Sequence, residues 1–438
     1  MVKKLGDNSK SVVVIGAGIA GIQAALDLGD MGINVYLVEK EPCIGGRMAQ
    51  LDKTFPTLDC SICILAPKLS ECYRHPNITL YTLSEVQKIE GSAGNFTVEV
   101  LKHPRYVKEG VCTNCGDCGS ICPVRGVPNF FDADLVTQSA AQIAFPAAVP
   151  PVYRINSDVC LYLNYGICGL CYQNCGADAI DFTQKEEVIP VENVGAIIVA
   201  TGVDLAENIH TLNVYGYQKY DNVVTAMEFE RLICASGPQQ GHLKTLTDGR
   251  TPKKIAFLQC IDSRNDRTQN YCSSVCCMYT TKEAMVAYEH DNELESYVFY
   301  IDLRAGGKGF QKFLLRGAKE YNIKYIKSKI SHIEVDENQS PIITYENLDS
   351  GEIKQMRFDL VVLATCIIPS LSNEKIAKIL GIDLDKNRFI KTDPFFPVES
   401  SVPGIYTCGC AREPMDIPRS VAEASGAAAR AAELVKGG

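Results

Sequence analysis

A glycine-rich turn between a strand and a helix is the feature that most constrains the fold of this 438-residue chain. An apolar run over 11–15 leads into Gly16-Ala17-Gly18-Ile19-Ala20-Gly21, a helix-forming run follows, and a second apolar run over 33–38 ends on Glu39. The glycines permit a tight turn and close approach of a pyrophosphate to the backbone, and the helix N-terminus attracts that group. Glu39 is placed to accept hydrogen bonds from a ribose. The sequence therefore predicts a dinucleotide-binding βαβ unit.

A second glycine pair follows the acidic residue and favours FAD over NAD. Gly45 and Gly46 stand just beyond Glu39, which resembles flavoproteins of the glutathione reductase and thioredoxin reductase type. Two apolar runs, 196–202 and 360–366, are similar to the strands by which those flavoproteins cross between their two nucleotide domains. The resemblance implies that this chain also holds FAD.

The segment 402–410 resembles the strand that ends at the flavin in those proteins. They usually carry Gly-Asp there, with the aspartate on the ribityl chain, whereas Cys410 follows Gly409 here. A helix expected over 420–434 would point its N-terminus at the carbonyl edge of the flavin ring. The residues expected to bind FAD are Gly16, Ala17, Gly18, Ala20, Gly21, Glu39, Lys40, Gly45, Gly46, Arg47, Met48, Val86, Thr201, Gly202, Thr365, Gly409, Pro418, Ser420 and Val421.

The chain has 20 cysteines and no secretory signal, which indicates metal ligation or redox chemistry. The spacing Cys112-x2-Cys115-x2-Cys118-x3-Cys122-Pro123 is typical of ferredoxins with two [4Fe–4S] clusters. A later set, Cys160-x7-Cys168-x2-Cys171-x3-Cys175, repeats that spacing over its last three cysteines. A structural zinc site is the less favoured alternative. Crossed ligation would give one cluster Cys112, Cys115, Cys118 and Cys175, and the other Cys160, Cys168, Cys171 and Cys122.

A third group of cysteines stands where a second nucleotide-binding domain would carry its glycine-rich turn. The apolar strand 254–259 leads into Cys260 without any glycine, and Cys272, Cys276 and Cys277 follow. Without glycines a pyrophosphate has no close approach to the backbone, so nicotinamide binding is not expected there. Four cysteines at one strand-to-helix turn indicate a third cluster, and buried inert thiols are the alternative.

Cys60 and Cys63 form a separate CxxC pair beyond the FAD turn. Three interpretations stay open for this pair: a redox dithiol near the flavin, part of a metal site, or a packing role. A dithiol reductase usually places its cysteines directly after the glycine-rich turn, and this pair is displaced from that position.

Four motifs together resemble the A subunit of heterodisulfide reductase over nearly the whole chain. They are the segment 54–63, the first ferredoxin motif, the segment 259–278 and the segment 416–422. The resemblance implies that Cys260, Cys272, Cys276 and Cys277 ligate a [4Fe–4S] cluster. The chain ends about where the flavin domain would close. That length and the segment 410–416 are more similar to the A subunit of the quinone-interacting membrane-bound oxidoreductase, which passes electrons between menaquinol and adenylylsulfate reductase in sulfate reducers.

The predicted fold is α/β, with two dinucleotide-binding (Rossmann-like, thioredoxin-reductase-like) domains and an inserted ferredoxin-like module for two [4Fe–4S] clusters. The FAD domain is expected to be discontinuous, over 1–105, 191–250 and 376–438. The ferredoxin-like module is expected over 106–190. The second Rossmann-like domain, with a cluster in place of its NAD(P) site, is expected over 251–375.

The predicted function is that of an FAD- and [4Fe–4S]-containing oxidoreductase subunit, in which FAD joins two-electron and one-electron carriers. The favoured role lies between menaquinol and adenylylsulfate reductase. The alternatives are a flavin-bifurcating subunit of a heterodisulfide reductase complex, a stand-alone NAD(P)H-dependent reductase and a scaffold with vestigial sites. Expected partners are the B and C subunits of either complex. No catalytic side chain is named.

Net charge and the length of the apolar runs limit the partners and the cellular location expected for this protein. A net charge of −9 argues against a nucleic-acid partner. No apolar run is long enough to span a bilayer, so we expect a cytoplasmic protein that meets the membrane only through a partner.

Overall fold

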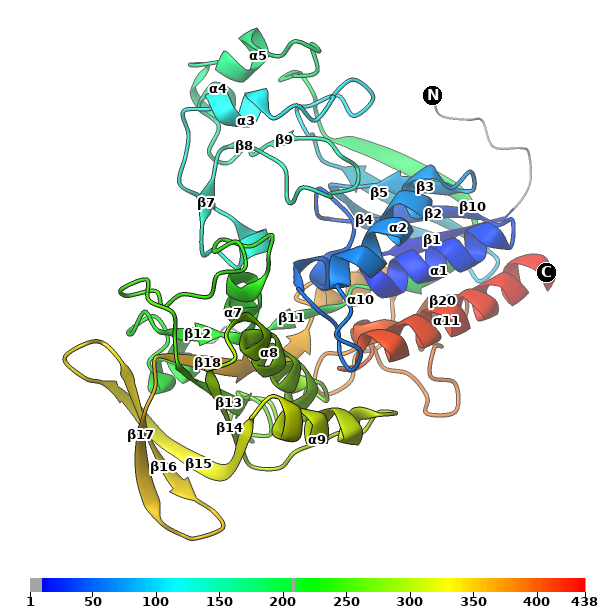
Figure 1. The fold of residues 1–438 in the computed structure, drawn as a ribbon. Coiled ribbons are helices and arrows are strands. Elements are labelled where there is room, and N and C mark those ends of the chain that lie inside the picture. Colours follow the sequence, from blue (N-terminus) through cyan, green and yellow to red (C-terminus); the bar gives the residue numbers. More distant parts are fainter. Residues whose placement is uncertain (1–9, 207–208, 438) are drawn as a thin grey trace.

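The computed structural model describes residues 10–206 and 209–437. Two α/β bodies are each built around a sheet that is parallel at its centre, and a smaller body is inserted into the first (Figure 1). The first body contains both ends of the described chain, and the second is formed by the middle of the chain.

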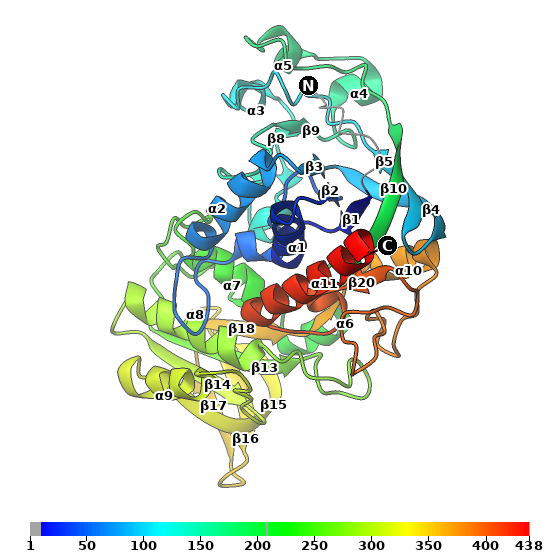
Figure 2. The same ribbon diagram turned by 90° about the vertical axis from the view of Figure 1, so that its right-hand side faces the viewer.

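The first sheet has the order β3-β2-β1-β10-β5-β4, and β20 pairs with the C-terminal part of β10. Its strands are β1 (Ser11–Ile15), β2 (Asn34–Val38), β3 (Ile78–Tyr81), β4 (Ser84–Ser92), β5 (Asn95–Lys102), β10 (Glu187–Val199) and β20 (Ile405–Thr407). Every residue of β1 is buried, as expected for a parallel strand that is covered on both faces. Val12 and Val14 pack against α1 (Ile19–Asp30) and α11 (Ile417–Gly437), which lie side by side (Figure 2).

Helix α2 (Ser61–Arg74) packs beside α1, and α10 (Asn373–Leu380) covers the opposite face near β4. The buried Val13 and Ile15 therefore share a core with α10. Between the glycine turn and α2, a short 3-10 helix η1 (Gly46–Gln50) brings the chain back over the carboxyl ends of the strands.

The second sheet has the order β12-β18-β13-β14-β15-β16-β17. Its strands are β12 (Val223–Thr225), β13 (Lys254–Ile261), β14 (Glu295–Tyr300), β15 (Lys324–Val335), β16 (Pro341–Asn347), β17 (Ile353–Arg357) and β18 (Leu360–Thr365). Pairing is parallel from β12 to β15 and antiparallel from β15 to β17. Helices α7 (Ala226–Ile233), α8 (Cys276–His290) and α9 (Phe310–Glu320) pack on one face.

The chain crosses between the two bodies through a two-stranded sheet of β11 (Val203–Leu205) and β19 (Ile367–Pro369). This crossing follows directly on the two apolar runs in which we expected it. The boundary before the second body differs from our expectation, because we assigned 191–250 wholly to the FAD domain. Strand β12 pairs with β18, and α7 packs on α8, so 223–233 belong to the second body. The apolar content of β12 does not reveal which sheet it joins.

The inserted body lies above the first sheet in both views (Figures 1 and 2). It has little regular structure: helices α3 (Asp117–Ile121), α4 (Leu161–Tyr165) and α5 (Leu170–Gln173), the 3-10 helix η2 (Phe130–Asp132), and the strand pairs β6 (Val127–Pro128) with β7 (Thr137–Gln138) and β8 (Ala141–Gln142) with β9 (Arg154–Ile155). Its small core includes the thiols of Cys112, Cys118, Cys122, Cys160, Cys171 and Cys175 packed with apolar side chains.

Within the described residues, no helix is both long and apolar enough to cross a membrane.

Candidate functional site: a flavin cavity beside clustered thiols

A cavity of about 430 Å³ lies where the two bodies meet. One wall comes from the carboxyl ends of β1, β2 and β10, and the opposite wall comes from α7 and α8. Ligand sites of open α/β sheets form outside the carboxyl ends of their strands, and this volume is in the range of small-molecule sites. The N-terminal end of α11 closes the floor with Ile417 and Ser420.

The glycine turn brings backbone against this cavity. Gly16 has a φ of +98°, and a Cβ there would lie 2.4 Å from the carbonyl oxygen of Ala200. Gly18 lines the cavity, and a Cβ on it would meet no atom within 4 Å. It begins α1 without a side-chain cap. The first N–H groups of α1 are therefore available to an anion, as a pyrophosphate site requires.

Glu39 ends β2 at the cavity wall and is 8% exposed. Its Oε2 accepts a hydrogen bond from the Ala17 backbone at 2.6 Å, and its Oε1 accepts one from the Glu41 backbone at 3.0 Å. Burial raises the pKa of Glu39, and the two backbone N–H groups oppose that rise. The carboxylate thus holds the turn in place and has acceptor capacity left for a ribose.

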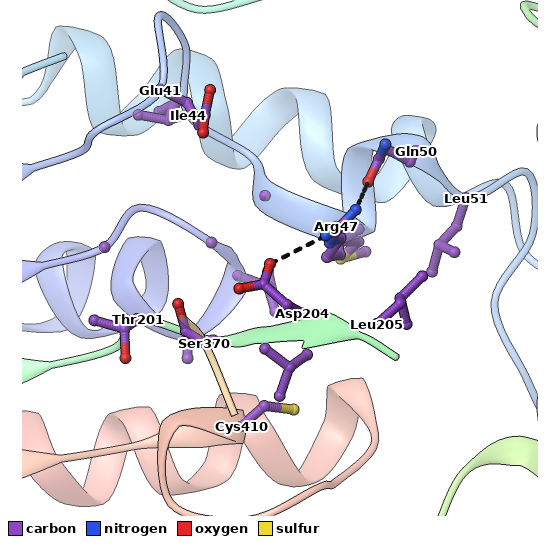
Figure 3. Close-up of a pocket in the computed structure, with 18 of the residues that line it drawn as sticks. Glu41, Ile44, Arg47, Gln50, Leu51, Thr201, Asp204, Leu205, Ser370 and Cys410 are labelled. Atoms are coloured by element: carbon purple, nitrogen blue, oxygen red, sulfur yellow. Dashed lines mark hydrogen bonds and ion pairs between the residues drawn. The ribbon is translucent and has the colours of Figure 1, made fainter. Parts of the chain in front are cut away.

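Arg47 ties the first body to the crossing sheet beside the cavity. Its Nη2 lies 3.2 Å from Oδ1 of Asp204 on β11, and its Nη1 donates to Oε1 of Gln50 at 3.2 Å (Figure 3). Asp204 also accepts a hydrogen bond from the backbone of Leu371. The cation is held by several partners and still lines the cavity, where an anionic ligand would meet it.

Most residues expected to bind FAD line this cavity. They are Gly16, Gly18, Ala20, Glu39, Lys40, Gly46, Arg47, Met48, Val86, Thr201, Gly202, Thr365 and Ser420. Ala17, Gly21, Gly45, Gly409, Pro418 and Val421 do not line it, although they adjoin residues that do. Cys410, which stands where related flavoproteins carry an aspartate, lines the cavity and donates its thiol to the carbonyl of Met415 at 3.4 Å. The residues present fit an FAD molecule across this cavity.

A buried charged group on the second body was missed by sequence reasoning. Lys282 and Glu283 on α8 and Glu230 on α7 all line the cavity and are at most 2% exposed. Lys282 forms an ion pair with Oε2 of Glu230, whose Oε1 accepts a hydrogen bond from the backbone of Asp52 at 2.7 Å. The adjacent charges in an otherwise apolar stretch of α8 were the available signal, since charged residues are almost never fully buried unless they are paired.

Glu283 differs from its neighbours because its Oε2 has no hydrogen-bond partner among the described residues. Burial raises the pKa of Glu283 well above its ordinary value; the charge of Lys282 opposes this rise, and Glu230 adds to it. Burial therefore favours the protonated, neutral form of this carboxyl group over the carboxylate. The cavity wall thus contains a buried ion pair and, beside it, a carboxyl group whose neutral form is favoured.

The raised pKa predicts a pH dependence of stability. Above pH 4.5 the unfolded chain loses the Glu283 proton while the folded chain keeps it, so the free energy of unfolding falls as pH rises. The slope is about 1.4 kcal/mol per pH unit until the folded pKa is reached. Glu283→Gln should abolish this part of the slope in urea titrations that begin at about pH 5.5 and proceed to higher pH. Glu337→Gln, at an exposed position, is the control and should leave the slope unchanged.

The four cysteines of the second body gather at the end of β13 and the start of α8. Cys260 is the strand residue at which φ becomes positive, at 61°, and Cys276 and Cys277 begin the helix. Their thiols lie close enough to affect one another's ionisation. A charge on Cys272 raises the pKa of Cys260, and charges on Cys260 and Cys272 raise the pKa of Cys277. Backbone N–H groups point at two of these sulfurs, from Ser274 to Cys272 at 3.3 Å and from Arg304 to Cys277 at 3.4 Å.

This thiol group adjoins the flavin cavity. Val275 and Tyr279, on either side of the Cys276-Cys277 pair in sequence, both line the cavity. Burial raises the pKa of Cys276, and the Tyr279 hydroxyl, which donates to the Thr365 carbonyl at 3.5 Å, opposes that rise. The end of β13, where a glycine turn would admit a nicotinamide cofactor, is therefore occupied by thiols and their supporting backbone.

In the inserted body, Cys122, Cys160, Cys168 and Cys171 line one small cavity of about 20 Å³. This is the set that crossed ligation assigns to one cluster. Burial raises the pKa of Cys118 to about 12, and the neighbouring thiols of Cys112 and Cys115 add to this rise. Cys175 accepts a hydrogen bond from the backbone of Ala179 at 3.3 Å.

The described part of the chain contains no three Cys, His, Asp or Glu side chains that converge as ligands of one metal ion. A cubane does not need such convergence, because each of its thiolates binds a different iron at a corner of the cluster. The three thiol groups therefore stay predicted cluster sites.

Cys60 and Cys63 form a disulfide at the start of α2. Cys60 Sγ accepts a hydrogen bond from the backbone of Cys63 at 3.2 Å, and Cys63 is exposed. Neither residue lines the flavin cavity. Of the interpretations left open by the sequence, the disulfide agrees with a dithiol pair but places it outside the flavin site.

Comparison with known proteins begins with the nucleotide-binding turn. Residues 11–58 match the family model for FAD dependent oxidoreductases. In fold, the chain is similar to a thioredoxin reductase from Lactococcus lactis, with a TM-score of 0.53, 16% identity, and coverage of 98% of this chain and 99% of that one. The expected α/β architecture of thioredoxin-reductase-like domains is thus confirmed, and the ferredoxin-like character of the insert stays a prediction.

Two relatives identify the family. The iron-sulfur A subunit of the CoB–CoM heterodisulfide reductase of Methanocaldococcus jannaschii is 46% identical over 97% of this chain, which spans 64% of that protein. A protein of Archaeoglobus profundus, named for its likeness to the A subunit of heterodisulfide reductase, is 39% identical over 99% of this chain, which spans 67% of that protein. The chain therefore belongs to the heterodisulfide reductase A-subunit family of oxidoreductase subunits.

Proposed function

We propose that this chain is an electron-transfer subunit in which one FAD meets three [4Fe–4S] clusters. The observation that carries the proposal is the position of the third thiol group. Cys260, Cys272, Cys276 and Cys277 stand at the end of β13, directly behind the wall of the flavin cavity. That position serves electron transfer to or from a flavin in the cavity, because Val275 and Tyr279 of this same segment form the wall.

Bound FAD would exchange electrons in pairs or singly, and each [4Fe–4S] cluster would carry one electron. The protein's own contribution is to hold these groups and to manage protons. Lys282 presents an ammonium group to the cavity, and Glu230 fixes its position through a buried ion pair. Burial raises the pKa of Glu283 at the same wall, which favours its protonated form. These side chains can balance the charge that electrons bring to a water-poor site.

A stand-alone NAD(P)H-dependent reductase is disfavoured by the same geometry. Gln259 and Cys260, near the end of β13, carry side chains where a glycine turn would have to leave room for a pyrophosphate. Loop residues from Ser263 to Tyr271 then fold back on this end, with the Ser263 hydroxyl donating to the Tyr271 carbonyl at 3.0 Å.

The partners we propose are other subunits of a heterodisulfide-reductase-type complex. The name of the Methanocaldococcus relative speaks of a CoB–CoM heterodisulfide reductase, and it favours this complex over the menaquinol-linked role in sulfate respiration. That second role depended on chain length and on the segment 410–416 alone. Cysteines that ligate clusters, as proposed here for three sets of four, suit the reducing interior of a cell.

Anoxic purification with an iron and flavin count tests the proposal. We expect about twelve irons per FAD, from three clusters of four irons. The variant Cys272→Ser should fall to about eight irons per FAD while its flavin content stays unchanged. Neither NADH nor NADPH should reduce the flavin of the wild-type protein. Four or fewer irons per FAD, or rapid reduction by either nucleotide, would contradict the proposal.

A further inference from the structure

Two arginines converge on the thiol group of the second body from different loops. Arg264 lies four residues beyond Cys260, and Arg304 follows β14. Both approach Asp302, with Arg304 Nε at 3.3 Å and Arg264 Nη2 at 3.7 Å from its Oδ2. Two guanidinium groups and one carboxylate are thus held together at the mouth of the thiol group, and the cationic charge is in excess.

The residues that carry these charges contact the thiol group at Cys277. The Cys277 thiol donates to the Asp302 carbonyl at 3.9 Å, and the Arg304 backbone N–H donates to Cys277 Sγ at 3.4 Å. Arg264 Nη1 is buried and has no hydrogen-bond partner among the described residues. A buried guanidinium N–H without a protein acceptor is costly unless a further acceptor faces it.

We propose that Arg264 and Arg304 raise the reduction potential of the cluster held by Cys260, Cys272, Cys276 and Cys277. Reduction adds one electron and no proton to such a site, and hence one negative charge. A guanidinium stays charged at every accessible pH, and it stabilises the more negative, reduced form. The buried Nη1 of Arg264 would donate a hydrogen bond to a cluster or thiolate sulfur, which acts in the same direction. This inference rests on the proposed three-cluster function.

The cluster beside the flavin would then accept an electron more readily than it would without the two guanidinium groups. Arg264 and Arg304 are thus positioning residues that set a potential; they are not catalytic residues.

An anoxic redox titration followed by electron paramagnetic resonance tests this on the full chain. In Arg264→Gln the ratio of oxidised to reduced third cluster at a fixed potential should rise about tenfold, which is about 59 mV for one electron. Arg304→Gln, at a more exposed side chain, should shift it less in the same direction. Arg264→Lys keeps the positive charge, so the reduction potential of the third cluster should stay close to that of the wild-type protein. Arg430→Gln, on α11 beside Glu399, matches the change in net charge and should have no effect.

The signals of the insert provide the internal reference. They should keep their potentials in all four variants. The inference would be overturned if the reduction potential of the third cluster were unchanged in both glutamine variants, or if the potentials of all clusters shifted equally. Either result would leave the three-cluster function intact. A wild-type protein with only two cluster signals, identified by comparison with Cys272→Ser, would overturn both.

Discussion

Replacing Lys282 with methionine is expected to lower the free energy of unfolding by about 3–5 kcal/mol, because it leaves Glu230 as an uncompensated buried charge. Both side chains are 1% exposed, so water cannot replace the lost ammonium group. Urea titration under anoxic conditions, followed by far-ultraviolet circular dichroism, measures the loss. Release of flavin fluorescence in the same titration shows whether the cavity opens together with the fold.

Two variants separate this effect from simple loss of a side chain. In Lys282→Met with Glu230→Gln, the charges of this ion pair are both removed, and the Gln oxygen can still accept from the Asp52 backbone. This double variant should recover most of the stability. Lys53→Met removes an ion pair with Glu289, whose partners are about one third exposed, and should cost at most about 1 kcal/mol. A single Lys282→Met variant as stable as Lys53→Met would contradict the role of the buried pair.

The glycine turn and the cysteine sets could be predicted because their signals are local. Gly16 needs a left-handed φ and close contact with Ala200, and both demands act on a single position in a strand–turn–helix segment. The ferredoxin-type spacing likewise places several thiols within one short loop. Such patterns are visible without knowledge of the tertiary structure.

The buried ion pair and the paired arginines could not be predicted in this way. Glu230 and Lys282 are 52 positions apart, and they meet only because α7 and α8 pack on the same face of the second sheet. Arg264 and Arg304 come from loops after different strands. Arginine, lysine and glutamate are all common in surface loops and helices. Apart from the adjacent charges in α8, the sequence therefore carries no sign that these four side chains belong to a site.

The packing of α7 also explains how two walls from different bodies are held together around the cavity. The Asp52 backbone donates to Glu230, and Arg231 Nη1 donates to the Gln50 carbonyl at 2.8 Å. Arg231 also pairs with Asp132 of the insert at 2.9 Å, and it is 1% exposed. Helix α7 is therefore joined by buried, charge-assisted hydrogen bonds both to the flavin body and to the insert. These contacts between bodies could not be predicted, because 223–233 were assigned to the FAD domain from the sequence.

Gly18→Val is expected to lower the affinity for FAD by about tenfold or more while the protein stays folded. A Cβ at Gly18 would meet no protein atom within 4 Å and would enter the cavity in front of the α1 N-terminus, where the pyrophosphate is expected. Its effect on apoprotein stability should be limited to about 1 kcal/mol, because a β-branched residue is a poorer N-cap than glycine.

Gly16→Ala is the matched variant, since it changes the same turn by a different mechanism. Its φ of +98° and a Cβ only 2.4 Å from the Ala200 carbonyl oxygen should destabilise the apoprotein as well as reduce FAD binding. Flavin content after purification, a binding titration of the apoprotein with FAD, and urea titration of the apoprotein distinguish the two. If Gly18→Val bound FAD as tightly as the wild-type protein, the pyrophosphate could not lie against this turn, and the assignment of the cavity would have to change. If Gly16→Ala left stability unaltered, the close packing of the turn on β10 would not be what maintains its shape.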